Sequence, residues 1–451
     1  MDIREFKEKL FAKAEESGLK EYEIFYSKNE NFNINVYNNE LDKYSVSEIM
    51  GVGFRASVAD KMGYAYTTKL DEESIDFLIK SVLYNAANIE NEEKEFIYNK
   101  VDNYKEVKSF SEGLMRSTSL EKIDLALKLE EAAKAASEKV TNIGYCGLGC
   151  YTEERGIYNS YGVNATHKSN FIYAGINPVV SYGQKVYNEM AYVIGYDIKD
   201  INPEVLATEA VKEAEKRIGG TSVTSGKYKV VLRNDVAAEL LNTFAGAFCA
   251  DNAQKGLSLF KDKEGTIVAS EKVTLIDNPL MEYGLASTPF DGEGVATSEK
   301  AVIDKGSLVT LLHNLKTAEV AKVKTTGNAS RPSYASAISV APTNFYFKPG
   351  DYSFEELLDK LGEGLLITDL AGTHAGANPI TGDFSLAAKG FSVSGGKIVK
   401  PVEQITVAGN FYQLLKDVEE VGKDLKFILP SGSSYYGSAS ILISKLSVAG
   451  K

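Results

Sequence analysis

A short run of small residues divides this chain of 451 residues into two parts with different hydrophobic patterns. Residues 219–226 read GGTSVTSG, a composition that is typical of a flexible linker between folded units. A chain of this length also exceeds what a single hydrophobic core usually supports. We therefore predict two domains, one over residues 1–220 and the other over residues 227–451.

The first part repeats one order of elements, in which a helix is followed by strands and then by another helix. Apolar spacing and alternation predict this order as helix 2–17, strands 22–68, helix 72–87, helix 120–139, strands 142–196 and helix 203–217. Asp71 is placed to cap the helix that follows it. The repeated order indicates an α+β domain whose antiparallel strands carry helices on one face.

The second part is rich in glycine and in short strand-like segments, which helical segments interrupt. Helices are predicted over residues 235–249, where Asp235 is the expected N-cap, and over residues 353–363. Short strands separated by glycine-containing turns are typical of a barrel or a sandwich. The predicted fold class is therefore α+β, with an N-terminal antiparallel sheet that carries helices and a C-terminal, mainly-β, barrel-like domain.

The acidic balance of the chain limits its partners. The 50 Lys and Arg side chains are outnumbered by 62 Asp and Glu side chains, which gives a formal charge of −12 and no general attraction to nucleic acid. The first residues lack the apolar stretch of a secretory signal, and no run of about 18 apolar residues offers a membrane span. We expect a soluble cytoplasmic protein with no nucleic-acid or membrane partner.

Cysteine and histidine are too scarce to indicate a disulfide framework or a histidine-rich metal site. The cysteines are Cys146, Cys150 and Cys249. Their odd, small number suits a reducing compartment, and we interpret all of them as small apolar residues. The histidines His167 and His313 have no second histidine at helical spacing, and each is expected to be an ordinary packed or surface residue.

His374 lies in a glycine-rich stretch whose polar side chains are able to approach a ligand closely. The candidates in this stretch are Thr373, His374, Asn378 and Asp383. The alternative interpretation is structural. In that case the glycines form tight turns and Asp383 caps one of them.

A second polar cluster contains Asp291 and Glu293 within the sequence PFDGEG. Two carboxylates two residues apart would face the same side of a strand, where they could act as an acid/base pair or as half of a metal site. More often such residues hold a turn through contacts with backbone amides, and we favour that interpretation.

Several ordered segments of the second part resemble the TldD/PmbA protease family. They are residues 286–294 (ASTPFDGEG), residues 368–370 (TDL) leading into 382–385 (GDFS), residues 401–410 (PVEQITVAGN) and residues 421–425 (VGKDL). Together they cover most of the predicted second domain. The first domain matches the family in its layout of elements.

The resemblance implies a cytoplasmic proteolysis system built from two homologous subunits. In that system the TldD-type chain holds zinc through a helix-borne HExxxH motif and a later cysteine, while the PmbA-type (TldE-type) chain lacks this set. The implied substrates are unfolded or flexible peptides that enter an enclosed groove between subunits. An older name of the family is modulator of DNA gyrase, which implies no DNA binding.

At the positions that the resemblance assigns to the zinc motif, this chain has residues unsuited to zinc hydrolysis. Asn242 and Ala247 stand for the histidines and Thr243 for the glutamate, while the tail at residues 427–434 contains no cysteine. Alanine has no donor atom, asparagine is a poor zinc ligand, and threonine cannot act as a carboxylate base. The resemblance thus implies no cofactor in this chain and zinc in a partner subunit.

The leading hypothesis is a PmbA-type subunit of a metalloprotease, paired with a TldD-type chain as a heterodimer or with itself when isolated. In this hypothesis it binds peptide through groove candidates that hold no metal: Asp291, Glu293, Thr373, His374, Asn378 and Asp383. A stand-alone peptide-binding or scaffold protein without catalytic activity is the alternative. Metal-independent hydrolysis by Asp291, Glu293, His374 and Asp383 is a third hypothesis, for which no nucleophile and base are evident.

Overall fold

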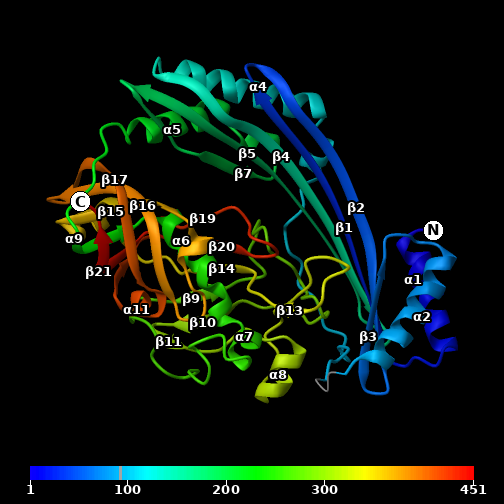
Figure 1. Ribbon diagram of the computed structural model, residues 1–451. Coiled ribbons are helices and arrows are strands. Elements are labelled where there is room, and N and C mark those ends of the chain that lie inside the picture. The colour runs from blue at the N-terminus through cyan, green and yellow to red at the C-terminus, as the bar shows by residue number, and fades with distance from the viewer. Residues whose placement is uncertain (91–93) are drawn as a thin grey trace.

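A long antiparallel sheet dominates the N-terminal half of the chain in the computed structural model, which describes residues 1–90 and 94–451 (Figure 1). The strand order is β3-β2-β1-β4-β5-β6, and β7 also pairs with β5. The strands are β1 (Tyr22–Tyr37), β2 (Glu40–Val58), β3 (Lys61–Thr67), β4 (Val140–Asn159), β5 (Asn164–Tyr182), β6 (Lys185–Asn188) and β7 (Ala191–Gly195). The predicted antiparallel strands are thereby confirmed.

Helices pack in pairs at opposite ends of this sheet, α1 with α2 and α4 with α5. They are α1 (Ile3–Glu16), α2 (Glu72–Asn88), α4 (Ser119–Ala136) and α5 (Pro203–Glu215), with the short α3 (Glu112–Arg116) and the 3-10 turn η1 (Ile198–Asp200) beside them. Asp71 caps α2 as predicted, because its side chain accepts a hydrogen bond from Ser74 N. Within the described residues no helix combines the length and apolar character needed to cross a membrane.

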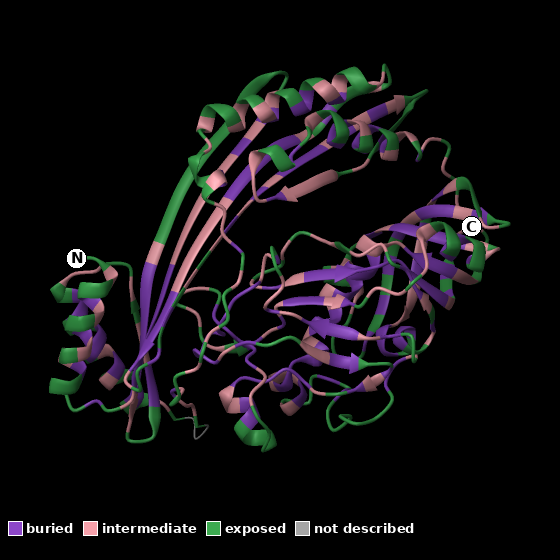
Figure 2. Ribbon diagram, turned by 180° about the vertical axis from the view of Figure 1, so that it is seen from behind, coloured by how far each residue is buried: buried purple, intermediate pink, exposed green. Residues whose placement is uncertain are grey.

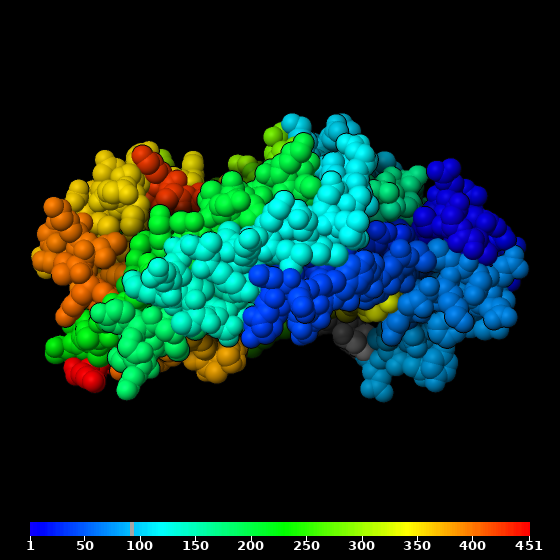
Figure 3. Space-filling model, turned by 90° about the horizontal axis from the view of Figure 1, so that it is seen from above, coloured from blue at the N-terminus to red at the C-terminus, as the bar shows by residue number. Residues whose placement is uncertain are grey.

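The sheet has one apolar face and one polar face because its residues alternate in direction. Residues such as Ile34, Leu148 and Ile172 are buried beneath α4 and α5. The alternate residues of β1, including Asn29 and Asn31, lie on the opposite, concave face. Figures 1 and 3 show that the sheet arches over the C-terminal domain and covers much of it when seen from above. The polar face therefore looks toward that domain.

The C-terminal domain is built around a closed barrel. Strands run in the order β17-β16-β15-β8-β21, and β17 also pairs with β21, which closes the barrel. The strands are β8 (Gly226–Leu232), β15 (Gly364–Ala371), β16 (Asp383–Ser394), β17 (Lys397–Asn410) and β21 (Ile441–Ala449), with β18 (Val418–Val421) joined to β21. The barrel-like, mainly-β prediction is confirmed, and the second predicted helix is α9 (Phe354–Leu361).

A second sheet, in the order β11-β10-β9-β14-β20-β19, packs beside the barrel, with helix α6 between them. Its strands are β9 (Leu275–Asp277), β10 (Lys300–Asp304), β11 (Ser307–Leu308), β14 (Asn344–Phe347), β19 (Lys426–Phe427) and β20 (Tyr435–Ser438). The remaining elements are α6 (Asn234–Phe244), η2 (Ala245–Phe248), α7 (Ala250–Gln254), α8 (Leu315–Ala321), α10 (Thr373–Gly376), α11 (Phe411–Lys416), β12 (Ala329–Ser330) and β13 (Ser339–Val340). Phe244 and Phe248 lie in one buried core shared with both sheets. Figure 2 shows the strands of this part of the chain mostly in the colour of buried residues.

Helix α6 differs from the prediction at both ends. Its N-cap is Arg233, and Asp235 lies in the first turn, so the predicted capping role of Asp235 is wrong. The reason is that the guanidinium of Arg233 binds the Asp235 carboxylate at 2.8 Å through two nitrogens. The α-helix ends at Phe244 and continues to Phe248 only as a 3-10 turn, short of the predicted end at Cys249.

A buried ionic cluster joins the two domains. The Glu23 carboxylate on β1 accepts hydrogen bonds from Arg55 on β2, at 2.8 and 3.1 Å, and from Arg331 of the C-terminal domain, at 2.9 Å. All three side chains are almost fully buried. The Arg331 guanidinium also lies 4.5 Å from the ring centroid of Phe25, a favourable cation–π contact. We call this set the Glu23 cluster.

Tyr334 makes a further contact between the domains, at glycine positions of the sheet where no side chain covers the backbone. Its N–H donates to Ser27 Oγ at 3.1 Å, and its ring and carbonyl lie over Gly51 and Gly53. A Cβ added at Gly53 would come within 2.2 Å of the Tyr334 carbonyl oxygen. Glycine is therefore required there, because any side chain would lift the C-terminal domain off the sheet.

Replacing Glu23 by glutamine should destabilise the protein by about 3–5 kcal/mol, because two buried guanidinium groups would lose their counter-charge. Urea unfolding followed by circular dichroism measures the change. The matched control is Glu72→Gln, which breaks an exposed pair with Lys9 and should leave the midpoint unchanged. Equal midpoints for both variants would show that the Glu23 cluster does not hold the domains.

Candidate functional site

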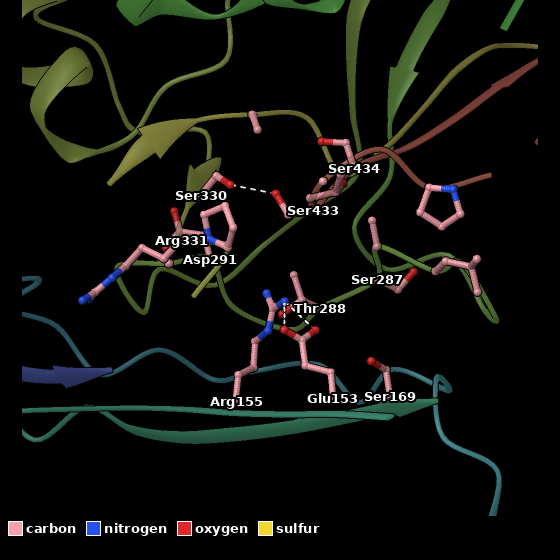
Figure 4. A pocket seen from close by; sticks show the side chains of 18 of the residues that line it. Glu153, Arg155, Ser169, Ser287, Thr288, Asp291, Ser330, Arg331, Ser433 and Ser434 are labelled. Carbon is pink, nitrogen blue, oxygen red and sulfur yellow. Dashed lines mark hydrogen bonds and ion pairs between the residues drawn. The ribbon is translucent and has the colours of Figure 1, made fainter. Parts of the chain in front are cut away.

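A cavity of about 270 Å³ lies between the concave face of the sheet and loops of the C-terminal domain (Figure 4). The residues of the sheet that line the cavity are Asn29, Asn31, Tyr151, Thr152, Glu153, Arg155, Ser169 and Phe171. The loops contribute residues 285–288, 291–292, 327–332, 341–343, 430 and 432–434. We call this cavity the interdomain groove.

The sheet wall of the groove contains one ion pair, between Glu153 and Arg155 on β4. Nη2 of Arg155 lies 2.7 and 2.6 Å from the two carboxylate oxygens of Glu153. Behind this pair, His167 is held by Ser287 O at 3.0 Å and Ser109 Oγ at 3.2 Å. Burial and the charge of Arg155 lower the pKa of His167 to about 4, so its imidazole is neutral near pH 7.

The loop wall of the groove presents hydroxyl groups. Ser330 Oγ and Ser433 Oγ lie 2.8 Å apart, and Figure 4 shows the hydrogen bond that joins them. Ser287 Oγ donates to Met281 O at 2.7 Å, and Ser434 Oγ donates to Pro342 O at 2.6 Å. These bonds fix the loops and leave the hydroxyl oxygens able to accept, so the serines make this wall polar beside its two charged residues, Asp291 and Arg331.

Asp291 and Glu293 lie in a turn, as the favoured interpretation predicts. Asp291 Oδ1 accepts from the N–H groups of Glu293 and Val295, at 2.9 and 3.0 Å, and Oδ2 accepts from Ala329 N at 3.0 Å. Asp291 lines the groove, while Glu293 points away from it and accepts from Leu315 N at 2.8 Å. The two carboxylates therefore organise the loops rather than present a free acid/base pair.

Their burial perturbs proton binding. Burial and the charge of nearby Asp291 raise the pKa of Glu293 to about 8, although the charge of Arg55 opposes the shift. Burial also raises the pKa of Asp291, which its three N–H donors counteract. Glu293 accepts one N–H group where Asp291 accepts three, so the charged form of Glu293 is stabilised less. Where one of the two carboxylates holds a proton near neutral pH, we therefore assign that proton to Glu293.

The candidates on the glycine-rich stretch lie elsewhere. Asn378 Oδ1 accepts from the N–H groups of Ile380 and Thr381, and Asp383 accepts from the Thr381 hydroxyl and from Asn410 Nδ2, both at 2.8 Å. These contacts are those of a tight turn. Thr373 and His374 belong to α10, which packs against α6. Among the described residues, those of this stretch do not line the interdomain groove.

The structure brings together the positions that the resemblance assigns to zinc. Asn242 and Thr243 lie on α6, against which β19 and β20 pack, and the tail at residues 427–434 connects these two strands. The donors do not fit zinc. Thr243 Oγ1 already donates to Glu239 O at 2.8 Å, Ala247 is buried without a donor, and the described residues contain no group of three or more His, Cys, Asp or Glu placed to hold a metal.

Glu239 on the same helix was not evident from the sequence. Burial, together with the charges of Asp369 and Asp235, raises its pKa to about 7. No motif marks this residue, because Asp369 comes from β15 and only the fold brings it close. The sequence does contain a pattern that indicates the groove. Along β1 every second residue is an asparagine, which predicts a polar strand face: Asn29, Asn31, Asn33 and Asn35. That signal would have located the sheet wall.

The fold and the groove define an α+β protein with a C-terminal barrel and a cavity between the barrel's domain and the N-terminal sheet. Comparison with family models then identifies the family. The chain belongs to the PmbA/TldA metallopeptidase family, because residues 22–86 match its domain 1, residues 117–218 its central domain and residues 225–450 its C-terminal domain. The resemblance drawn from the sequence is thereby confirmed.

The chain is also similar to individual proteins and solved structures. The chain is similar to metalloprotease PmbA of Escherichia coli O157:H7, with 28% identity over 332 residues, 73% of this chain and 70% of the relative. A solved Thermotoga maritima structure with the provisional name of a modulator of a DNA gyrase has a TM-score of 0.91 and 33% identity, over 99% of this chain and 100% of that one. TldE from Thermococcus kodakarensis shares the fold, with a TM-score of 0.87 and 22% identity over 99% and 100%.

The raised pKa of Glu293 predicts a pH dependence. Its folded-state pKa of about 8 lies above the ordinary glutamate value of 4.5, so its contribution to stability is complete below pH 4.5 and is lost as the pH rises toward 8. Glu293→Gln should remove this decline, which the two pKa values place at about 3–4 kcal/mol between pH 5 and pH 8. Urea unfolding between about pH 5 and pH 8 measures it. Exposed Glu282→Gln is the control, and a parallel decline in all three proteins would contradict the assignment.

Ala247 predicts a difference from chains that carry the full zinc motif. The residue is 1% exposed and packs in the aromatic core around Phe248, so Ala247→His should cost about 1–3 kcal/mol by overpacking. The control is Asn242→His, because Asn242 is only half-buried and should accept an imidazole with little change. Thermal unfolding compares the two, and an unchanged midpoint for Ala247→His would show that the core has room for the ligand.

Proposed function

We propose that this chain is the PmbA/TldE-type subunit of a cytoplasmic metalloprotease, which binds flexible peptides in the interdomain groove while a TldD-type partner holds the zinc. The observation that carries the proposal is the loop between β19 and β20. This loop lines the groove with Pro430, Ser433 and Ser434, while the strands on either side of it pack against α6. A peptide in the groove would thus contact the segment that joins two strands packed on the helix that bears the zinc motif in TldD-type chains.

The side chains at the zinc-motif positions favour a non-catalytic role for this chain. Asn242, Thr243 and Ala247 supply neither ligands nor a general base for a zinc-bound water. Nor does the groove assemble the residues of a metal-independent hydrolase. Asp291 is tied down by three backbone donors, and His374 belongs to a different part of the domain.

Elemental analysis and peptide cleavage test the proposal in three samples: this chain, a TldD-type partner and their mixture. We expect no stoichiometric zinc in this chain, and faster, chelator-sensitive cleavage of an unstructured peptide in the mixture than in either subunit. Zinc together with cleavage in this chain alone would overturn the proposal. Peptide binding by this chain with no effect on the partner would favour the stand-alone binding protein.

A pair of variants on one loop tests whether the groove itself takes part. Ser433→Trp fills the groove and should lower cleavage by the mixture several-fold, mainly through a higher KM. Ser431→Trp lies two residues away, is exposed and does not line the groove, so it should leave cleavage unchanged. Equal rates for both variants would place the peptide elsewhere.

A further inference from the structure

The interdomain groove carries charged groups, but each of them is already neutralised within the protein. Glu153 and Arg155 bind each other, Asp291 accepts three backbone N–H groups, and Arg331 is bound to Glu23. Among the described residues that line the groove, these four are the charged ones. The charge of each arginine is balanced by a glutamate, so a charged ligand would lose its hydration without gaining a free counter-charge. Nε of Arg155 and Nε of Arg331 are nevertheless buried donors without a hydrogen-bond partner, which a neutral acceptor such as a carbonyl group can use. The groove therefore suits an uncharged ligand.

Neither wall offers a free strand edge. The sheet wall is the face of β1 and β4, whose backbones already pair with neighbours on both sides. The outer edge of β5 is also occupied where it approaches the groove, because Asn170 N donates to Ser109 O at 3.0 Å. On the loop wall, Ala329 N donates to Asp291 and Ala329 O accepts from Gly292 N at 2.8 Å. A peptide thus cannot bind by adding a strand and must be held through side chains.

The side chains available are aromatic rings and amides. Tyr151 and Phe171 stack with ring centroids 4.9 Å apart at 22°, and both line the groove. The Tyr151 ring lies across Gly149, where an added Cβ would meet it at 3.0 Å, and the Tyr151 hydroxyl donates to Asn33 Oδ1 at 3.0 Å. This arrangement holds the rings against the sheet. Asn31 lines the groove as well, and because only one of its two amide hydrogens donates to Ser47 Oγ, at 3.4 Å, the other remains free to donate to a carbonyl group of a ligand.

We propose that the interdomain groove selects uncharged, proline-containing segments in the polyproline II conformation. This rests on the proposed function, since it specifies which peptides the groove takes. A polyproline II segment has no internal hydrogen bonds, so its carbonyl groups remain open to amide and hydroxyl donors, and its proline rings pack on aromatic faces. Because proline also restricts the free peptide, less conformational entropy is lost on binding.

Fluorescence anisotropy with labelled peptides tests the proposal on the full chain. The probe is a short, neutral Ala-Pro-Pro repeat, and the comparison is an Ala-Gly-Ser repeat of equal length. We expect the proline peptide to bind at least about tenfold more tightly. Tyr151→Ala should weaken its binding about tenfold through loss of ring stacking, while Tyr151→Phe should retain most of it. Tyr84→Ala, at a tyrosine of α2 that is 70% exposed, is the matched control and should bind like the unmodified chain.

Other outcomes overturn the proposal in distinguishable ways. Equal affinity for both peptides would refute proline selection and leave the proposed function intact. Binding of a neutral oligosaccharide in preference to either peptide would assign the rings to a sugar. If neither peptide binds while the mixture with a TldD-type partner still cleaves peptides, this inference alone fails. If binding and cleavage are both absent, the proposed function fails with it. Circular dichroism of each variant shows whether lost binding reflects lost folding.

Discussion

The carboxylate of Glu23 determines how the two domains meet, because it lies between guanidinium groups that come from both of them. Arg55 belongs to the same sheet as Glu23, whereas Arg331 is 308 positions away along the chain. None of these charges could remain buried without its partners. Ser330 and Pro332 flank Arg331 and line the interdomain groove, so the ion pair that secures the domain also positions that wall. The groove exists because the Glu23 cluster holds the loop near the sheet and the glycines beneath Tyr334 permit the close approach.

The pattern of apolar residues predicted the elements but not the groove. Residues 72–87 and 203–217 formed the expected helices, and the turn interpretation of Asp291 and Glu293 agrees with their backbone contacts, because such signals are local. Nothing in the local sequence marks the residues of the Glu23 cluster as partners. A glutamate and an arginine far apart in the sequence would each be taken for an ordinary surface residue. The N-cap assigned to Asp235 failed for a related reason. Only the fold shows that Arg233 captures its carboxylate and also donates to Thr368 O at 2.8 Å.

Helix α6 shows how a chain can keep the architecture of a metalloprotease without its ligands. The apolar side of the helix carries Leu240, Leu241 and Phe244, which fill the core between the barrel and the second sheet. That packing is needed whether or not the other side of the helix holds a metal. The polar side, with Glu239 and Asn242, is half-buried, and these two residues are not part of that apolar core. Fold and catalysis therefore depend on different sides of one helix, and similarity of fold alone does not establish activity.

The groove is fixed before any ligand arrives, and this bears on what it can select. Besides the Glu23 cluster, Tyr104 donates to Gly294 O at 2.7 Å, and Tyr196 donates to Tyr283 O, so separate contacts brace the sheet against the loops. Because the groove is preformed and its charged groups are paired within the protein, the protein loses little conformational entropy on binding. The entropic cost of binding then comes mainly from the peptide. Selection then favours segments that are already extended and stiff. The rigidity of the interdomain contacts and the neutral lining of the groove thus lead to the same class of ligand, although they arise from different residues.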